Sequence, residues 1–254
     1  MGRDGFRLVD EGGVRLARCE ALDAIPGIAH AFSTRVAHGR SDFDLGPAGE
    51  APPEVSARRR AFWSAAGLSG APPPILRQVH GTSVVEDGVP AEADGGIAVF
   101  SMGTSAAPAV RSADCVTILL VDRSGSAVAS AHAGWRGTAA RIAELAVRRL
   151  GERGVPAERL VAVLGPAVGA CCYEVGPDVV EALGGFSRPS GSGRITVDLH
   201  AANADQLASA GVPPRAIHRA PWCTRCRNDL FFSVRAEGAG AGRLMAVIGK
   251  SGQS

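Results

Sequence analysis

The sequence lacks a charge excess, long apolar runs and abundant aromatic residues, and the first two absences exclude classes of protein. Its 254 residues carry a formal net charge of +2, and the longest run of like charge that we identify is Arg58-Arg59-Arg60. A basic stripe is the usual footprint of nucleic-acid binding, so nucleic acid is not an expected partner. No apolar stretch approaches the roughly 20 residues needed to span a bilayer, so no membrane partner is expected either.

The amino terminus also lacks the apolar segment of a secretory signal, which favours a cytoplasmic location. The six cysteines are too sparse for a disulfide framework in a chain of this length. In a reducing compartment, cysteines more often act as ligands or catalysts. The cysteines are therefore candidates for metal binding or catalysis.

Short apolar runs alternate with helical patterns along the whole chain. Strands are expected over 28–34, 116–121, 127–131, 160–164 and 244–248, and helices over 55–67, 141–150, 177–183 and 201–210. Because no linker divides these elements, they predict an α/β fold in a single domain over 1–254, with mixed sheets flanked by helices. Three segments are expected to be mobile, namely the ends 1–5 and 251–254 and the segment 184–194, most of which is Gly/Ser-rich.

Three segments that follow or border predicted strands carry the chemistry. They are Arg77-Gln78-Val79-His80-Gly81, Ala113-Asp114-Cys115-Val116 and the stretch from Ala131 to Thr138. Together they offer the imidazoles of His80 and His132 and the thiol of Cys115. Three such ligands hold a divalent metal and leave a fourth position for water or substrate, as catalytic zinc sites do. The pattern predicts an enzyme with a metal-activated water or, failing that, a Cys–His nucleophile.

Residues next to these ligands are candidates for catalysis. His132 precedes Gly134-Trp135-Arg136-Gly137-Thr138, where glycines and a guanidinium suit a phosphate group at the start of a helix. Asp114 is placed to orient a histidine or to take a proton from bound water. We therefore predict Asp114, Cys115, His132 and Arg136 as catalytic residues.

Further polar residues are predicted to contact the substrate. Ser33-Thr34-Arg35 and Ser233-Val234-Arg235 are two similar pairs, readable as anion contacts or as surface salt bridges. Glu174 follows a loop and is placed to reach the cleft, and Gln78 belongs to the His80 segment. The predicted substrate contacts are Ser33, Arg35, Gln78, Glu174 and Arg235, and Trp135 is the aromatic best placed to stack on a base.

The remaining cysteine motif is Cys171-Cys172 together with Cys223-Thr224-Arg225-Cys226. Two CxxC units would be a strong zinc signal, whereas one is weak. Adjacent cysteines do not easily ligate the same ion. The pattern therefore favours packed thiols near a turn.

These segments closely resemble the YfiH family of laccase-domain proteins. The match includes Phe32 to Arg35, Gln78 to Gly81, Ala113 to Cys115 and, most specifically, His132 to Thr138. It continues through Gly165-Pro166, Cys172-Tyr173-Glu174, Asp198 to Asn203 and Phe231 to Arg235. Members of the family have been labelled polyphenol oxidases, purine nucleoside phosphorylases and peptidoglycan editing factors.

The resemblance implies a fold similar to the cytotoxic necrotizing factor/YfiH-like cysteine hydrolases. It implies zinc held by His80, Cys115 and His132, with a purine nucleoside and phosphate as small-molecule partners. The implied reactions are phosphorolysis of adenosine, inosine and methylthioadenosine and hydrolytic deamination of adenosine.

Three other interpretations use the same residues. A cysteine amidase that removes a misplaced amino acid from a nucleotide-linked muropeptide would use Cys115 and His132 as its dyad. Copper-dependent phenol oxidation is compatible with two histidines and a cysteine, but the dense His-x-His motifs of multicopper sites are missing, so copper ranks below zinc. A non-catalytic module with a structural zinc would need Cys172 or Cys223 to close the site.

Overall fold

The first of two large sheets is antiparallel throughout. In the computed structural model, which describes residues 5–46, 51–68, 70, 78, 83–86, 97–101, 107–191 and 193–252, its strand order is β1-β2-β3-β13-β6. These strands span Phe6–Glu11, Val14–Cys19, Ile28–Ala37, Leu244–Lys250 and Ala109–Ser112 respectively. The chain thus brings β13, near its carboxyl end, between β3 and β6.

The second sheet is mixed, as the sequence predicted. Its order is β12-β9-β7-β8-β5-β4, with parallel pairs only at its two edges. The strands span Ile217–Arg219, Leu160–Leu164, Val116–Asp122, Ala127–Ala133, Ile97–Ser101 and Val84–Glu86. Every residue of β7, β8 and β9 is buried. Continuous apolar runs of this kind indicate strands covered on both faces.

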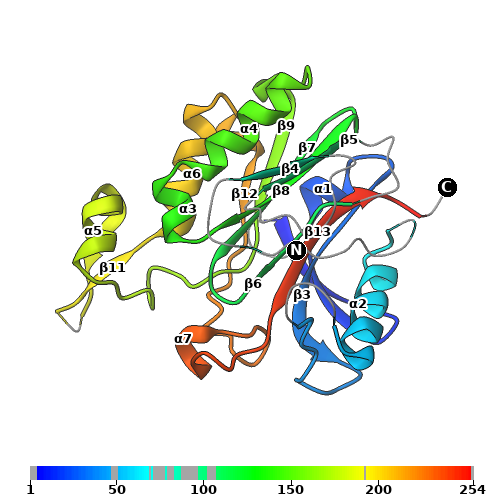
Figure 1. Cartoon of the computed structure of the whole chain (residues 1–254), viewed down its shortest axis with the longest axis horizontal. Coiled ribbons are helices and arrows are strands. Elements are labelled where there is room, and N and C mark those ends of the chain that lie inside the picture. Colours follow the sequence, from blue (N-terminus) through cyan, green and yellow to red (C-terminus); the bar gives the residue numbers. More distant parts are fainter. Residues whose placement is uncertain are drawn as a thin grey trace.

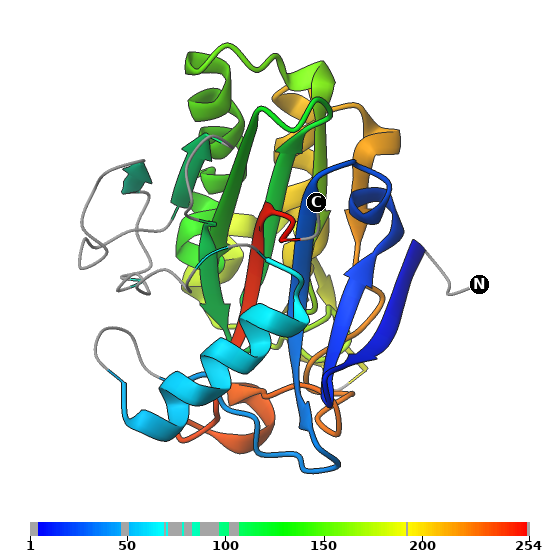
Figure 2. The ribbon, with the colours of Figure 1, turned by 90° about the vertical axis from the view of Figure 1, so that its right-hand side faces the viewer.

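Two sheets and two helical layers form the body of the protein (Figure 1). Because side chains alternate along a strand, β7 sends Ile118 and Leu120 toward the helices and Leu119 and Val121 toward the other sheet. Helices α4 (Ile142–Glu152) and α6 (Leu199–Ser209) cover the outer face of the mixed sheet. Figure 2 shows α2 (Pro53–Ala65) across the outer face of the antiparallel sheet, where Phe62 and Trp63 join its buried cluster.

Shorter elements connect these layers. They are α1 (Glu20–Asp23), α3 (Trp135–Ala139), α5 (Pro177–Leu183), α7 (Val234–Glu237) and the hairpin of β10 (Ser187–Pro189) and β11 (Ile195–Val197). The hairpin and α5 project from the body at the left of Figure 1. Among the described residues, no helix is long and apolar enough to cross a membrane.

The segment 184–194, which is expected to be mobile, contains local secondary structure. Gly184–Phe186 forms a 3-10 turn, and Ser187–Pro189 pairs with Ile195–Val197. Ser190, Gly191 and Gly193 lie in the connection between these two strands, and strand pairing is a property that composition does not report. The mobility of the segment stays a prediction. The predicted mobile ends at 1–4 and 253–254 lie outside the described residues.

Burial of His30 between the two sheets makes stability depend on pH. Its Nε2 accepts a hydrogen bond of 2.9 Å from the Cys19 amide, and its side chain is fully buried. Desolvation lowers the pKa of His30 to about 4, against a smaller opposing effect of Asp23. The imidazole is therefore neutral in the folded protein at pH values where it is already protonated in the unfolded chain.

We expect the free energy of unfolding to fall as pH is lowered from 6.5 to 4. The unfolded state binds a proton near pH 6.5 and the folded state only near pH 4, so the contribution is full above this window and is lost within it. The difference corresponds to about 3 kcal/mol for this one group. Urea unfolding of wild type and His30→Gln across the window measures it. A slope unchanged by the substitution would contradict the assignment to His30.

Candidate active site

Pairing between β7 and β8 brings the Asp114-Cys115 turn beside His132. Thr117 lies opposite His132, and Val116 opposite Ala133, so the turn before β7 meets the end of β8. Asp114, Cys115 and His132 line one cavity of about 430 Å³, a volume within the usual range for small-molecule sites. The structure thus brings together three of the four predicted catalytic residues.

The backbone of β6 orients the imidazole of His132. Nδ1 lies 2.7 Å from the Arg111 carbonyl oxygen, and a carbonyl only accepts hydrogen bonds, so the proton is on Nδ1. This tautomer leaves the Nε2 lone pair as the basic position of a side chain that borders the cavity. Metal-binding histidines are commonly held by such a bond from the other ring nitrogen.

Gln78 lies against the same strand. Its Nε2 donates to the Arg111 carbonyl and its Oε1 accepts from the Arg111 amide, both at 2.8 Å. Gln78 also lines the cavity. The predicted ligand His80, two residues further on, lies outside the described residues.

The Cys115 thiol lies in an environment that opposes ionisation. Burial, followed by the charge of Asp114, raises the pKa of Cys115 to about 12, although Arg243 and Arg235 act in the opposite direction. A thiol with this pKa is neutral at pH 7 and a weak nucleophile. A divalent cation would deprotonate it on binding. The surroundings therefore suit a metal ligand better than an unaided Cys–His nucleophile.

Asp114 connects three segments around the cavity. One carboxylate oxygen accepts from Thr224 Oγ1 at 2.6 Å and the other from the Arg235 amide at 2.7 Å. Its own carbonyl accepts from the Val168 amide at 2.9 Å. The backbone φ of Asp114 is +93°, a strained value that persists only where surrounding contacts impose it. Asp114 thus holds the cavity wall in place.

Three arginines, Arg111, Arg235 and Arg243, are among the residues that line the cavity. Burial, then the nearby Arg59 and Arg243, lowers the pKa of Arg111 to about 10, so it stays charged at pH 7. A cavity lined by several positive charges favours the binding of an anion. Arg235 also stacks on Tyr173, with 4.8 Å from Cζ to the ring centroid, and Tyr173 lines the same cavity.

Two predicted substrate contacts are occupied elsewhere. Ser33 is buried and its Oγ accepts from the Met245 amide at 2.9 Å. Arg35 donates to the Asn228 carbonyl at 2.9 Å and pairs with Glu237 at 3.1 Å. Neither is among the described residues that line the cavity. Their contacts join β3 to β13 and to the segment around α7.

Glu174 and Arg136 likewise lie outside the described cavity lining. Glu174 pairs with Arg194 at 2.7 Å, and its carbonyl accepts from Arg235 at 2.8 Å. Arg136 is exposed and stacks on Trp135 with 4.2 Å from Cζ to the ring. Arg136 is close to His132 in sequence, on the short helix α3. It is nevertheless not among the described residues that line the cavity.

Sequence reasoning did not select Arg111 and Arg243. Arg111 lies three residues before Asp114, on a strand too short to show a pattern. Arg243 follows a loop far along the chain and reaches the site through the pairing of β13 with β6. Only the proximity of Arg111 to the Asp-Cys motif offered a signal.

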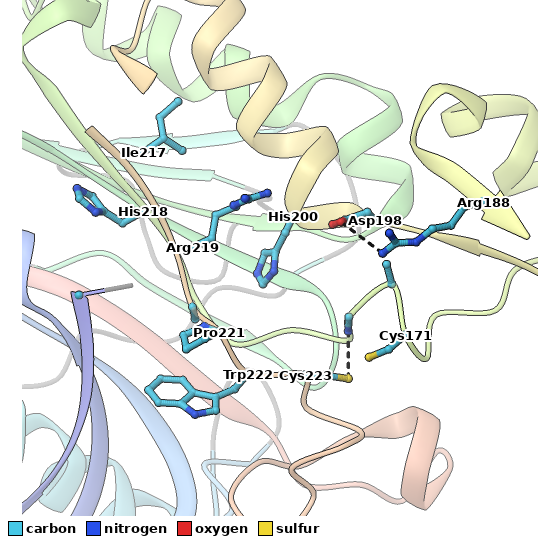
Figure 3. Close-up of a pocket in the computed structure, with 14 residues that line it drawn as sticks. Cys171, Arg188, Asp198, His200, Ile217, His218, Arg219, Pro221, Trp222 and Cys223 are labelled. Carbon is cyan, nitrogen blue, oxygen red and sulfur yellow. Dashed lines mark hydrogen bonds and ion pairs between the residues drawn. The ribbon is translucent and has the colours of Figure 1, made fainter. Parts of the chain in front are cut away.

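A larger cavity of about 850 Å³ lies beyond β12. Figure 3 shows His200, His218 and Trp222 along it, with the Arg188–Asp198 ion pair of 3.9 Å at one end. The Nε2 of His200 donates to the Gly165 carbonyl at 2.8 Å. Burial lowers the pKa of His200, which makes it a neutral structural donor. This cavity is the larger of the two, but the smaller one contains Asp114, Cys115 and His132 and is therefore the better candidate for an active site.

The comparisons with known proteins agree with the fold. Residues 29–251 match the family described as multi-copper polyphenol oxidoreductase laccase, and the chain belongs to that family. It is 32% identical over 235 residues to the purine nucleoside phosphorylase YfiH of Escherichia coli K12, covering 87% of this chain and 93% of the relative. The resemblance to YfiH proteins is therefore confirmed.

Two further likenesses have different extents. The chain is 42% identical over 147 residues to adenosine deaminase RL5 from an unknown prokaryotic organism, covering 55% of this chain and spanning about half the length of that relative (56%). The crystal structure of YlmD from Geobacillus stearothermophilus matches with a TM-score of 0.81 at 28% identity, covering 98% of this chain and 99% of that one. A mixed α/β single domain is confirmed by these matches, and the likeness to cytotoxic necrotizing factor stays a prediction.

Proposed function

We propose that this chain is a zinc-dependent purine nucleoside enzyme. It would phosphorolyse adenosine, inosine and methylthioadenosine to base and the ribose-1-phosphate product, and deaminate adenosine by hydrolysis. The observation that carries the proposal is that Cys115, His132 and three arginines line one cavity. The names of the relatives, a purine nucleoside phosphorylase and an adenosine deaminase, support the same chemistry.

The donor set fits zinc. His132 has its proton on Nδ1, which donates to the Arg111 carbonyl. The lone pair of Nε2 is then the one that would bind a metal. Cys115 supplies a soft sulfur ligand, and His80 is the third ligand expected from the sequence. When bound, zinc lowers the pKa of a coordinated water to near 7 and polarises substrate groups. Cysteine and histidine ligands also bind copper, and metal analysis of the purified protein distinguishes zinc from copper.

Side chains of the protein would bind phosphate, contact the base and transfer protons. Arg235 and Arg243, which line the cavity, would bind and orient phosphate against the ribose carbon, since forked donors suit phosphate oxygens. Tyr173 offers an aromatic surface on the same wall, suited to a base. Asp114 holds Arg235 through its amide. Asp114 also lines the cavity, where a carboxylate would receive a proton from bound water or a base N–H.

A product assay on purified protein of known metal content tests the proposal. Adenosine is incubated with and without phosphate, and inosine, adenine, hypoxanthine and ribose-1-phosphate are separated. Adenine that forms only with phosphate supports the phosphorylase, and inosine supports the deaminase. No turnover at full zinc occupancy would refute both. A covalent adduct on Cys115 with a nucleotide-linked muropeptide would then favour the cysteine amidase.

We expect Arg235→Gln to weaken phosphate use and Arg136→Gln to leave it nearly unchanged. Losing a charged hydrogen bond to phosphate costs about 1.5–3 kcal/mol, which corresponds to a roughly 10- to 100-fold rise in KM for phosphate. Deamination of adenosine, which uses no phosphate, should change less. Steady-state kinetics of both reactions measure the split.

Arg136 is the matched control because it is also an exposed arginine stacked on an aromatic ring. Equal losses of phosphorolysis and deamination in Arg235→Gln would show that Arg235 does not contact phosphate. A large effect confined to phosphorolysis in Arg136→Gln would return the phosphate role to that residue.

A further inference from the structure

Four cysteines from two loops meet outside the candidate active site. Cys171 and Cys172 lie in the turn after β9, and Cys223 and Cys226 lie in the loop after β12. Their four sulfur atoms all lie within 4.8 Å of one another. The sequence favoured packed thiols near a turn, because a single CxxC and an adjacent pair are weak signals when read separately. The fold joins them into one group.

The sulfur separations suit one shared metal ion. Cys226 Sγ lies 3.7 Å from Cys171 Sγ and 3.4 Å from Cys172 Sγ. Tetrahedral zinc with Zn–S bonds of about 2.3 Å places its sulfur ligands about 3.8 Å apart. A disulfide would require about 2.05 Å, and all six cysteines are free thiols. Thiols that only fill a core are buried, whereas Cys171 and Cys226 are exposed.

The backbone brings the adjacent cysteines to the same side. The amides of Cys172 and Tyr173 both donate to the Gly169 carbonyl at 2.9 Å, which closes a tight turn around Cys171. The second loop is joined to the first by the bridge between Ala167 and Cys223. The obstacle to an adjacent pair sharing one ion is therefore overcome by the turn.

Gly169 packs closely against the cysteine cluster. A Cβ there would lie 3.1 Å from Cys171 Sγ and 3.2 Å from Cys223 Cβ. Its amide donates to Cys223 Sγ at 3.2 Å, and a dashed line ends on the Cys223 sulfur in Figure 3. Amide donors to sulfur are typical of the outer shell that stabilises thiolate ligands. Arg225 lies within the Cys223–Cys226 segment and interacts electrostatically with Cys172, so it supplies positive charge beside a site that four thiolates would make negative.

We propose that Cys171, Cys172, Cys223 and Cys226 bind one structural Zn²⁺ ion in a closed four-sulfur site. Thiolate ligands select zinc over the hard cations magnesium and calcium. Four protein ligands leave no position for water or substrate, which is the property of structural rather than catalytic zinc. The site is separate from the cavity that contains Cys115 and His132 and does not depend on the activity proposed there.

The zinc would stabilise the wall of the active-site cavity. Tyr173, which lines that cavity, directly follows Cys172, and Thr224, which donates to Asp114, directly follows Cys223. An ion held by both loops fixes their separation. It would thereby fix the positions of Tyr173 and of the Asp114 carboxylate without contacting substrate.

Metal analysis of a full-length variant without the cavity ligands tests this site alone. In Cys115→Ala/His132→Ala, we expect about one tightly bound zinc per chain, measured by mass spectrometry after purification with zinc and desalting. Adding Cys226→Ser should reduce zinc to near zero, and adding Cys19→Ser instead should leave it unchanged, because Cys19 lies on β2, outside the cluster. Less than about one tenth of an equivalent in the double variant would overturn the proposal.

Cobalt(II) provides a readout that does not require a folded cysteine variant. In the same double variant, cobalt should give intense thiolate-to-metal charge-transfer absorption and the visible bands of a tetrahedral site. A spectrum of cobalt bound by oxygen or nitrogen alone would refute the four-sulfur assignment. Chelation should also lower the Tm of the double variant, since removing a ligand of the native state removes its stabilisation. Because no activity is measured, failure here is distinct from failure of the nucleoside proposal.

Discussion

Replacing Cys115 or His132 with alanine is expected to remove the cavity metal and to lower kcat/KM by more than about 100-fold. Loss even of an outer-shell partner costs about 10- to 100-fold in metal affinity or activity, and these residues are proposed as ligands. The fold should survive, because the β7–β8 backbone pairing does not involve either side chain. Zinc content, circular dichroism and steady-state kinetics of each variant measure the three quantities.

Ser130→Ala is the matched control for this experiment. Ser130 lies on β8, two residues before His132, and its buried hydroxyl has no hydrogen-bond partner among the described residues. Removing that hydroxyl should leave metal content and activity unchanged. Full activity in metal-free Cys115→Ala or His132→Ala would refute the zinc mechanism.

Asp114→Ala is expected to destabilise the protein by about 2–5 kcal/mol and to impair catalysis as well. The substitution leaves the Thr224 hydroxyl and the Arg235 amide without their acceptor, at a cost of about 1–3 kcal/mol each. It also places alanine at φ +93°, a conformation that aspartate and asparagine tolerate better. Urea unfolding measures the stability, and the KM for phosphate reports the position of Arg235.

Asp114→Asn separates support of the wall from proton transfer. Asparagine keeps one acceptor and tolerates the backbone conformation, so the stability loss should be smaller than with alanine. If Asp114 acts only by positioning Arg235, the pH profile of kcat/KM keeps its shape in the asparagine variant. Loss of the acidic limb of that profile would show instead that the carboxylate accepts a proton in the reaction.

The strands and helices with strong periodicity could be predicted from the sequence. The apolar runs of β7, β8 and β9 lie between two covering layers, so their composition alone reports burial. The β10–β11 hairpin could not be predicted in this way, because its Gly/Ser-rich turn looks like a mobile loop. Its order comes from pairing between Ser187–Pro189 and Ile195–Val197, which is a property of two segments together.

Of the predicted active-site residues, some lie on the cavity and others do not. Asp114, Cys115 and His132 were found because strand ends in one sheet bring their residues together. The substrate contacts were harder, since Ser33 and Arg35 resemble anion-binding residues in sequence but donate to or accept from neighbouring backbone. Arg243 was missed because β13 reaches β6 only through long-range pairing.

The sequence by itself determined the α/β class and the family resemblance and led us to propose Cys–His chemistry, because short motifs and periodicity are local properties of the chain. The tertiary structure decided which cations face the cavity and placed Cys171 and Cys172 beside Cys223 and Cys226. Both outcomes depend on contacts between distant segments, 54 and 55 residues apart for the cysteine pairs and 121 for Arg235 and Asp114. Such contacts are set by sheet pairing and packing, whose free energy belongs to the whole fold and to no single motif.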